Sequence, residues 1–409
     1  MILTSASAAA LDAADPVAAA REHFILPPGV IYLDGNSLGA LPRATPARLA
    51  DVAVQEWGEG LIGSWNAADW IGASARIGAK IAPLIGANPR EVIAADSTSV
   101  NLFKLIAGAL AMRPDRRVVL SEPGNFPTDL YMIEGLARMG LAELRLAPEE
   151  IAASIDEQVA LVVLSHVHYK TGAVHDMAAI TAAAQAKGAM VLWDLSHSAG
   201  AIPVMLNHCN ADLAVGCGYK YLCGGPGAPA FAYVAERHIA AFANPLSGWM
   251  GHAAPFAFAD GYAPAPGIER LLCGTPAILG LAALEVGVET IAAIGITALD
   301  AKRAALTEAF AQSVLALGAG HGLERVGPRD PAQRGSQIAF RHPEAWAINR
   351  ALIARGVIGD FRAPDILRFG FAPAYVGYGD ALIAAQTLAE ILATKAWDCA
   401  EFRERLAVT

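Results

Sequence analysis

Short apolar runs alternate with longer amphipathic stretches through the middle of the chain. The stretch 176–188 is helix-like and ends in a glycine, as helices often do. Five apolar runs have the length of buried strands: EVIAA (91–95), RVVLS (117–121), ALVVLS (160–165), AMVLWDL (189–195) and ADLAVGCG (211–218). Nearly continuous apolar strands that alternate with helices predict an α/β fold, with a mainly parallel sheet covered on both faces.

The two ends of the chain have a different pattern. The alanine-rich first twenty residues predict a short helix or arm, and IYLDGNSLGALP (31–42) predicts a short strand with a glycine-rich turn. A helix is expected from Thr45 to about Trp57, with Pro46 in its first turn. After about residue 280, a long alanine-rich helix leads to strands separated by a helix, which predicts a smaller α+β domain. We expect an N-terminal arm with the start of the small domain at 1–50, a large domain at 51–285 and a small C-terminal domain at 286–409.

The composition predicts an extensive hydrophobic core and argues against nucleic acid and membranes as partners. Of the 409 residues, 55% are hydrophobic and 17% are charged, so the chain can bury much apolar surface. The net charge is −9 and no block of lysine and arginine interrupts it, which argues against nucleic acid or an anionic membrane as a partner. Residues 239–259 carry no Asp, Glu, Lys or Arg, but their two prolines argue against a membrane-spanning helix.

The five cysteines form no C-x-x-C pair and no metal-ligand spacing. This pattern predicts reduced thiols in a cytoplasmic protein without a bound metal. The N-terminal segment has no basic residue before Arg21 and no continuous apolar stretch, so we do not expect a signal peptide.

The strongest chemical signal is an acid and an amine at the ends of two predicted strands. Asp194 closes one strand and His197 follows it, while Lys220 comes just after another strand and is the only charged side chain in 213–235. Ligands of open parallel sheets bind beyond the carboxyl ends of the strands. A lysine that bonds to an aldehyde and an aspartate that keeps a ring nitrogen protonated are what pyridoxal phosphate requires. The alternatives are a surface lysine and an aspartate that caps a helix.

Other strand ends carry weaker signals. The hydroxyls of residues 97–99 begin a predicted helix, where a phosphate or a simple capping role for Asp96 or a serine would fit. Phe126 and Asp129 follow another strand, where the aromatic ring either stacks on a flat cofactor or plugs the core. In the C-terminal part, the guanidinium of Arg368 suits a carboxylate, or it is a rim arginine paired to Asp365.

Eight motifs in order give the chain a specific resemblance: LDGNSLG, WGEGLIGSWN, DSTSVNLFK, NFPTD, DLSHSAG, GYKYLCGGPG, GWMGH and CGTP. Together with the C-terminal SQIAF…RFGFAPAY, they resemble kynureninase of the bacterial type over nearly the whole chain. The resemblance implies the aminotransferase-like (type I) pyridoxal phosphate fold and a homodimer with a composite active site. It also implies hydrolysis of L-kynurenine to anthranilate and L-alanine, in tryptophan catabolism.

The resemblance assigns roles to individual residues. Lys220 is similar to the lysine that holds the cofactor, and Tyr219 to a phosphate contact that also serves in acid–base chemistry. Further cofactor contacts are implied at Thr98, Ser99, Phe126, Asp129, Ser165, Asp194, His197, Trp249 and Thr275, and substrate contacts at Asn36, Ser37, Trp65 and Arg368. Trp249 and Thr275 are expected from the partner subunit. Eukaryotic kynureninases carry Asn at the position of Thr275 and a His near that of Trp65. The resemblance therefore implies no preference between kynurenine and 3-hydroxykynurenine.

Two other classes of pyridoxal phosphate enzyme are alternatives. A cysteine desulfurase-like lyase would share the fold and the Asp–Lys pair, but it needs a nucleophilic cysteine well after the lysine. No cysteine lies between Cys273 and Cys399. An aminotransferase would use the same lysine and aspartate. A homologue that only binds ligand would be expected to have lost Lys220 or Asp194, and both are present.

Overall fold

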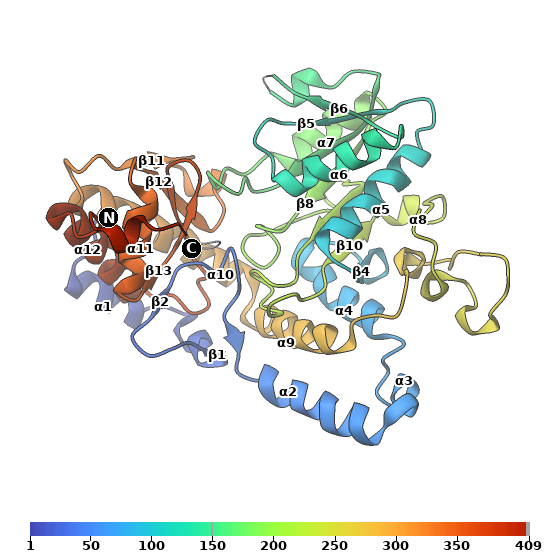
Figure 1. Ribbon diagram of the computed structural model, residues 1–409, viewed down its shortest axis with the longest axis horizontal. Helices are drawn as coiled ribbons and strands as arrows, with labels where there is room; N and C mark the ends of the chain where they lie inside the picture. Colours follow the sequence, from blue (N-terminus) through green and yellow to red (C-terminus); the bar gives the residue numbers. More distant parts are fainter. Residues whose placement is uncertain (149, 406–409) are drawn as a thin grey trace. The chain divides into compact units, whose positions relative to one another are not determined.

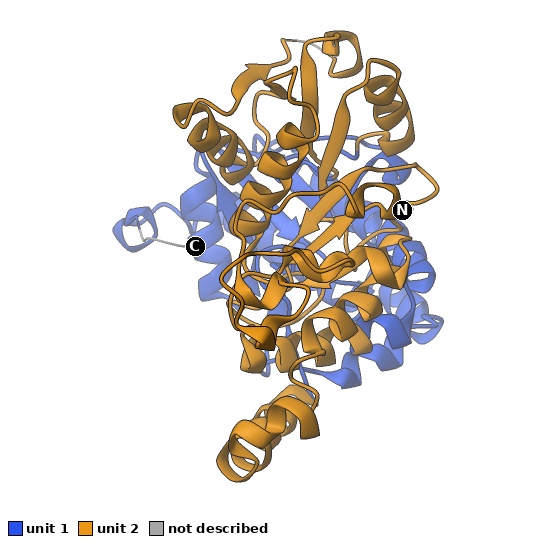
Figure 2. Ribbon diagram, turned by 90° about the vertical axis from the view of Figure 1, so that its right-hand side faces the viewer, with its two compact units in different colours: residues 1–43, 167–174, 290–409 blue, residues 44–166, 175–289 orange. Residues whose placement is uncertain are grey.

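The computed structural model describes residues 1–148 and 150–405. The chain forms two compact units, coloured separately in Figure 2. Unit 1 consists of 1–43, 167–174 and 290–409, and unit 2 consists of 44–166 and 175–289. The grouping of the short segment 167–174 with the chain ends has no counterpart in the sequence pattern.

Unit 2 is built on a seven-stranded sheet with the order β4-β10-β9-β8-β7-β5-β6. The strands are β4 (Val92–Ala94), β5 (Val118–Ser121), β6 (Glu143–Leu146), β7 (Val159–Ser165), β8 (Met190–Asp194), β9 (Leu213–Gly216) and β10 (Phe231–Val234). β10 runs antiparallel to both of its neighbours, whereas the pairs from β9 through β8, β7 and β5 to β6 are parallel. The predicted α/β fold with a mainly parallel sheet is confirmed.

Helices α4 (Ala73–Ile81), α5 (Thr98–Ala111), α6 (Pro127–Arg138) and α7 (Met177–Ala186) pack against this sheet. The unit also contains α2 (Thr45–Asp51), α3 (Ser64–Ala67) and α8 (Glu236–Ile239), and α9 (Ile278–Ile294) begins in it. Figure 1 shows α5 and α6 lying along the strands. The apolar side of α5 packs with β7, β8 and β9 in one buried cluster, so α5 presents its N-terminus to the carboxyl end of the sheet.

All five strands predicted for this sheet are present, and two of its strands, β6 and β10, were missed. β6 is short and partly exposed, so it lacks the continuous apolar run of a buried strand. β10 is apolar, but it has only four residues and follows a loop rich in glycine and proline. So short an apolar run does not identify a strand in the sequence. The helix expected from Thr45 begins as predicted and continues past Asp51 as a wider helical turn to Glu59.

Unit 1 contains a four-stranded antiparallel sheet with the order β11-β12-β15-β14. Its strands are β11 (Glu324–Val326), β12 (Gln337–Arg341), β14 (Asp360–Arg362) and β15 (Ile366–Gly370). Two small pairs add β1 (Phe24–Ile25) to β3 (Leu41–Pro42), and β2 (Ile31–Tyr32) to β13 (Val357–Ile358). The helices are α1 (Ser5–Ala13), α10 (Ile296–Leu317), α11 (Ala345–Ala354), α12 (Tyr378–Thr394) and α13 (Ala400–Arg403). The predicted α+β architecture of the smaller domain is confirmed.

The long alanine-rich helix expected after residue 280 is present, but it is divided into two helices, α9 and α10. Gly295 lies between them with φ of +91°, a conformation that glycine adopts readily and that breaks the helix. Among the described residues no single helix is long and apolar enough to cross a membrane, and only this bent pair meets the requirement by length and composition.

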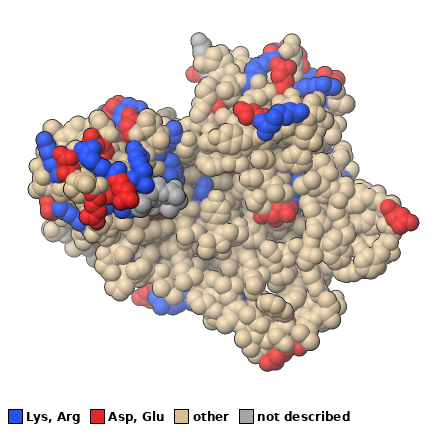
Figure 3. Space-filling model, viewed as in Figure 1, with Lys and Arg blue, Asp and Glu red and all other residues tan. Residues whose placement is uncertain are grey.

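Figure 3 shows one face of the protein, on which most atoms belong to uncharged residues. On the face shown in Figure 3, lysine and arginine alternate with aspartate and glutamate, and neither sign forms a continuous field.

Gly78 lets α4 approach β4 closely. A Cβ atom on Gly78 would lie 2.2 Å from the Val92 carbonyl oxygen and 2.8 Å from Ile93 Cα. We therefore expect Gly78→Ala to lower the free energy of unfolding by about 1–3 kcal/mol, because backbone atoms cannot move aside cheaply. Urea unfolding measures the effect. Gly63→Ala is the matched control, since nothing lies within 4 Å of its Cβ position. Equal stability of the two variants would contradict the close approach.

Candidate active site

Two of the candidate residues end neighbouring parallel strands. Ser165, the last residue of β7, lies opposite Asp194, the last residue of β8. The backbone N–H of Ser196 donates to Asp194 Oδ1 at 2.7 Å. Turns and no helix follow over 196–201, so the alternative that Asp194 caps a helix is wrong.

Lys220 is buried beside Asp194. Its side chain lies five residues past the last β8–β9 partner, Val215, and the residue is only 7% exposed. Lys220 Nζ lies 3.1 Å from His197 Nε2 and 5.6 Å from the centre of the Phe126 ring. The surface-lysine alternative is therefore wrong. Four predicted residues, Phe126, Asp194, His197 and Lys220, come together from three separate segments.

Two buried carboxylates face this lysine. Burial raises the pKa of Asp194 above its ordinary value, while the Ser196 N–H and the Lys220 charge act in the opposite direction. Burial also raises the pKa of Asp129 well above its usual range, and the nearby charge of Asp194 adds to the effect. Asp129 Oδ1 has no hydrogen-bond partner among the described residues. The site thus concentrates acceptors that suit a protonated ring nitrogen.

Asn125 organises the loop that carries Phe126, and the sequence analysis missed it. Its Oδ1 accepts from the backbone N–H of Phe126 at 2.8 Å and from that of Ser165 at 3.1 Å. Its amide group donates to Ser121 Oγ at 3.1 Å. Asn125 therefore joins the ends of β5 and β7 and fixes Phe126 next to Lys220. The only signal in the sequence was its place in the NFPTD motif.

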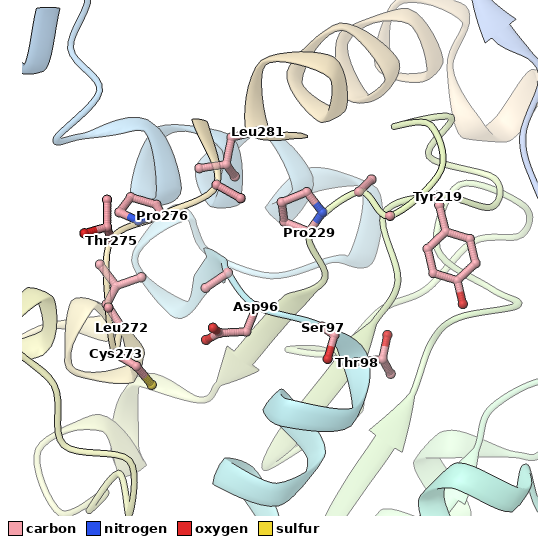
Figure 4. Close-up of a pocket in the computed structure, with 15 residues that line it drawn as sticks. Asp96, Ser97, Thr98, Tyr219, Pro229, Leu272, Cys273, Thr275, Pro276 and Leu281 are labelled. Carbon is pink, nitrogen blue, oxygen red and sulfur yellow. The ribbon is translucent and has the colours of Figure 1, made fainter. Parts of the chain in front are cut away.

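A cavity of about 320 Å³ opens at the N-terminus of α5. Its lining includes Thr98, Tyr219 and Thr275, which Figure 4 shows together with Asp96 and Ser97. Ser97 caps the helix by accepting from Val100 N–H at 3.3 Å, so the capping alternative holds for that residue. Thr98 Oγ1, by contrast, is buried and has no partner among the described residues. Free N–H groups of a helix start and an unsatisfied hydroxyl are suited to an anion.

Tyr219 contributes a phenol to the same cavity. Burial is the main reason that its pKa is raised far above the ordinary value, and Cys217 and Asp194 add to the shift. The phenol therefore keeps its proton at neutral pH and can donate it. Its ring centre lies 5.8 Å from Lys220 Nζ.

Two predicted residues lie elsewhere in unit 2. Trp249 is 39% exposed, packs edge-on against Phe256 and lines a separate cavity with His252 and Tyr262. Trp65 on α3 packs edge-on against Trp70. Neither ring is among the side chains gathered around Lys220.

In unit 1, Arg368 is buried in a network of charges, with 1% of its surface exposed. Its Nε donates to Asp360 Oδ1 at 2.8 Å, and its Nη2 contacts both Asp360 Oδ2 and Ser37 Oγ. Arg362 Nη2 reaches the same Asp360 Oδ2 at 2.7 Å. With its amide oxygen turned to the guanidinium, Asn36 lies 2.9 Å from Arg368 Nε. Three predicted substrate residues, Asn36, Ser37 and Arg368, are thus neighbours.

The alternative that Arg368 is a rim arginine paired to Asp365 is wrong. Asp365 pairs instead with Arg341, at 3.3 Å. The reason is strand register: Arg368 lies opposite Asp360 on the antiparallel neighbour β14, so the two side chains share one face of the sheet. Sequence spacing alone gave no sign of Asp360 or Arg362.

Asp34 makes the stability of this network depend on pH. Burial, together with the charge of Asp360, raises the pKa of Asp34 from 3.8 to about 7. Folding therefore favours the protonated form, and the stabilisation it gives is lost as the pH rises from about 4 through about 7. We expect Asp34→Asn to gain stability relative to the parent protein between pH 5 and pH 7, with a constant difference above pH 8.

Urea midpoints at several pH values would test this expectation. Asp51→Asn is the control for the substitution itself, at a position where the side chain is 53% exposed. Parallel pH profiles for Asp34→Asn and the parent protein would contradict the raised pKa.

These residues fit the predicted pyridoxal phosphate. The unsatisfied Thr98 hydroxyl at the start of α5 suits the phosphate, and the Phe126 ring suits the flat face of the pyridine. The buried Asp194 carboxylate would be stabilised by a ring-nitrogen proton. Lys220 has the amine that would hold the cofactor, within the same enclosed site.

Comparison with known proteins places the chain among its relatives. The family model described as "Kynureninase C-terminal domain" matches residues 299–388. The kynureninase of Burkholderia mallei (strain SAVP1) is 51% identical over 414 residues, which cover 99% of this chain and 100% of that protein. The kynureninase of Pseudomonas fluorescens is 50% identical over 409 residues, which cover 98% of each chain.

Solved structures support the fold. The apo structure of a cysteine desulfurase from Thermococcus onnurineus NA1 matches with a TM-score of 0.76 at 21% identity, covering 92% of this chain and 98% of that one. A C-DES mutant with glycine covalently linked to the PLP cofactor matches with a TM-score of 0.77 at 17% identity, covering 90% and 99%. At such low identity these neighbours confirm the predicted type I fold, and they say nothing about the reaction. The two kynureninases, by contrast, are 51% and 50% identical to this chain over nearly its whole length, and this chain therefore belongs to the kynureninase family.

Proposed function

We propose that this protein hydrolyses L-kynurenine to anthranilate and L-alanine, with pyridoxal phosphate held by Lys220. The observation that carries the proposal is the buried Lys220 next to Asp194 and Phe126, in a chain 51% identical to a kynureninase over its whole length. When bound, the cofactor draws electrons from the substrate's α-carbon and so makes the neighbouring bonds easier to break.

Each residue of unit 2 then has a role toward the cofactor. Asp194 would accept from the ring nitrogen and keep it protonated, and Phe126 would stack on the ring. Thr98, Ser99 and Tyr219 would hold the phosphate at the start of α5. Asp129, Ser165 and His197 would complete the surroundings of the ring, and His197 Nε2 lies within hydrogen-bond distance of Lys220 Nζ.

Lys220 is the base of the reaction. Its amine is enclosed and lies between His197 and the aromatic rings of Phe126 and Tyr219. It takes the proton from the α-carbon of the substrate and returns a proton later in the cycle.

Tyr219 is proposed as the acid at the substrate's γ-carbonyl. Its phenol stays protonated at neutral pH because burial raises its pKa. Water adds to that carbonyl, the Cβ–Cγ bond breaks, and the carbonyl carbon leaves as the carboxylate of anthranilate. A proton added at Cβ gives the methyl group of alanine, so one water is consumed for each substrate.

Arg368 is proposed to bind the substrate's carboxylate. Asn36 and Ser37 were expected at the aromatic end, but both contact Arg368, so we propose them for the carboxylate end and Trp65 for the aromatic end. The guanidinium already donates to Asp360, to Ser37 Oγ and to the Tyr169 carbonyl. These bonds use four of the five guanidinium N–H groups, so one N–H of Nη1 is left to donate to the carboxylate. Ser37 Oγ also donates to Asp360 at 2.9 Å, so it would keep that bond if the carboxylate replaced it at Arg368.

We also propose a cytoplasmic homodimer. Large apolar side chains such as Trp57, Ile62 and Phe258 are 60%, 81% and 78% exposed, which suits burial against a second subunit. Trp249, exposed beside Phe256, is the stronger candidate for a residue donated to the partner's site, whereas Thr275 lines the cavity of its own chain. The five free cysteines suit a reducing compartment.

Product analysis separates this function from its two rivals. Purified protein with pyridoxal phosphate is given L-kynurenine, L-cysteine or L-alanine with a 2-oxoacid, in separate reactions. We expect turnover of kynurenine alone. Cys273 is a poor nucleophile for desulfurase chemistry, because burial raises the pKa of its thiol. Sulfide release from cysteine, or amino transfer without anthranilate, would overturn the proposal.

A further inference from the structure

Lys104 is a buried cation that the proposed reaction does not use. It lies in the middle of α5 and is 0% exposed. Its Nζ donates to Asp96 Oδ2 at 2.7 Å and to the carbonyl oxygen of Leu271 at 2.8 Å. Burying an ammonium costs several kcal/mol, by order of magnitude, unless good partners compensate. Both partners of Lys104 belong to segments that line the cavity at the start of α5.

Asp96 lies at this cavity in an uncommon backbone conformation. It adopts a left-handed conformation with φ of +52°, which is rare for a residue other than glycine. Its backbone oxygen accepts from the N–H of Ala230 at 2.8 Å. Its carboxylate is 31% exposed, and Figure 4 shows it within the cavity, between Ser97 and the segment that carries Leu272 and Cys273.

This arrangement brings an anion close to the proposed phosphate site. Asp96 and Thr98 line the same cavity, so an uncompensated carboxylate would repel a phosphate bound at Thr98. The Lys104 ammonium, 2.7 Å from the carboxylate, offsets that charge. Its second bond, to Leu271, fixes the start of the opposite wall, which continues to Thr275.

We propose that Lys104 is a positioning residue for the phosphate end of the cofactor. It neutralises Asp96 and joins the two walls of the cavity, without contacting the cofactor itself. The inference rests on the proposed function, because it needs a phosphate-bearing ligand at Thr98. A purely structural role for the Lys104–Asp96 pair would stabilise the fold without distinguishing ligands with and without a phosphate.

The test compares two ligands on four apoproteins. The proteins are the parent chain, Lys104→Met, Asp96→Asn and the double variant, each titrated with pyridoxal phosphate and with pyridoxal while the visible absorbance of the bound aldehyde is followed. We expect Lys104→Met to bind pyridoxal phosphate about tenfold more weakly, with less than about a twofold change for pyridoxal. The double variant should recover most of the loss, because no carboxylate is left uncompensated.

Asp96→Asn keeps the test decisive if Lys104→Met does not fold. That variant leaves the positive charge without its anion, so its preference for pyridoxal phosphate over pyridoxal should rise above that of the parent protein. Equal weakening of both ligands, no recovery in the double variant, or an unchanged preference in Asp96→Asn would overturn the inference. If the parent protein binds pyridoxal phosphate normally, such a result leaves the proposed function intact. If the parent protein does not bind it at all, both fall.

Discussion

Replacing Lys220 with alanine is expected to lower the rate of kynurenine hydrolysis by about a thousandfold or more. The variant loses the amine that holds the cofactor and the base for the α-carbon proton in one step. The visible absorbance of covalently held pyridoxal phosphate should disappear as well. Both changes are measured on the same sample, by absorbance after cofactor addition and by anthranilate fluorescence.

A second lysine variant provides the control. The Lys187 side chain is 45% exposed and pairs with Glu157 at 2.8 Å. It has no role in the proposed site. Lys187→Ala should keep both the absorbance and the rate. If Lys220→Ala retained the rate, another amine would hold the cofactor, and the assignment from the strand ends would be wrong.

Asp194→Asn is the second large effect that we expect, and it separates activity from stability. The amide keeps the shape of the side chain but cannot keep a ring nitrogen protonated, so the rate should fall roughly a hundredfold to a thousandfold. The apoprotein should become more stable at neutral pH, because folding raises the pKa of Asp194 and so disfavours its charged form. This gain should shrink as the pH falls toward the ordinary pKa of an aspartate.

Asp212 is a matched buried carboxylate with the opposite behaviour. It accepts from Arg237 at 2.7 Å, from His238 at 2.8 Å and from the Val191 N–H at 3.0 Å. Although burial alone would raise its pKa, these hydrogen bonds lower it. Asp212→Asn should therefore lose about 1–3 kcal/mol of stability at neutral pH and keep its cofactor absorbance. A loss of stability in both variants would contradict the account of Asp194.

The strands and the residues at their ends could be predicted from the sequence, because both depend on residues that are close together along the chain. Apolar runs predicted β5, β7 and β8, and the rule that ligands bind beyond strand ends singled out Asp194 and Lys220. The surrounding fold then explains why these two residues meet: their strands are adjacent and parallel.

Contacts between segments that are far apart in the sequence could not be predicted. Lys104 meets Leu271 across 167 positions of sequence, and the motif that ends in Lys104 gives no sign of that partner. Asp360 was missed because its partner Arg368 depends on the register of an antiparallel pair, and Asp365 was closer in sequence. The bend between α9 and α10 depended on a single glycine in an otherwise helical stretch. In each case a long-range pairing or one backbone conformation decided the outcome.

The most direct measurement is the stoichiometry of products from L-kynurenine. Purified protein saturated with pyridoxal phosphate is mixed with L-kynurenine, and anthranilate and alanine are quantified over time. The account predicts equal amounts of the two products, with neither formed by Lys220→Ala. Firm covalent binding of the cofactor through Lys220 without anthranilate would contradict kynurenine hydrolysis, while leaving the fold and the cofactor site in place.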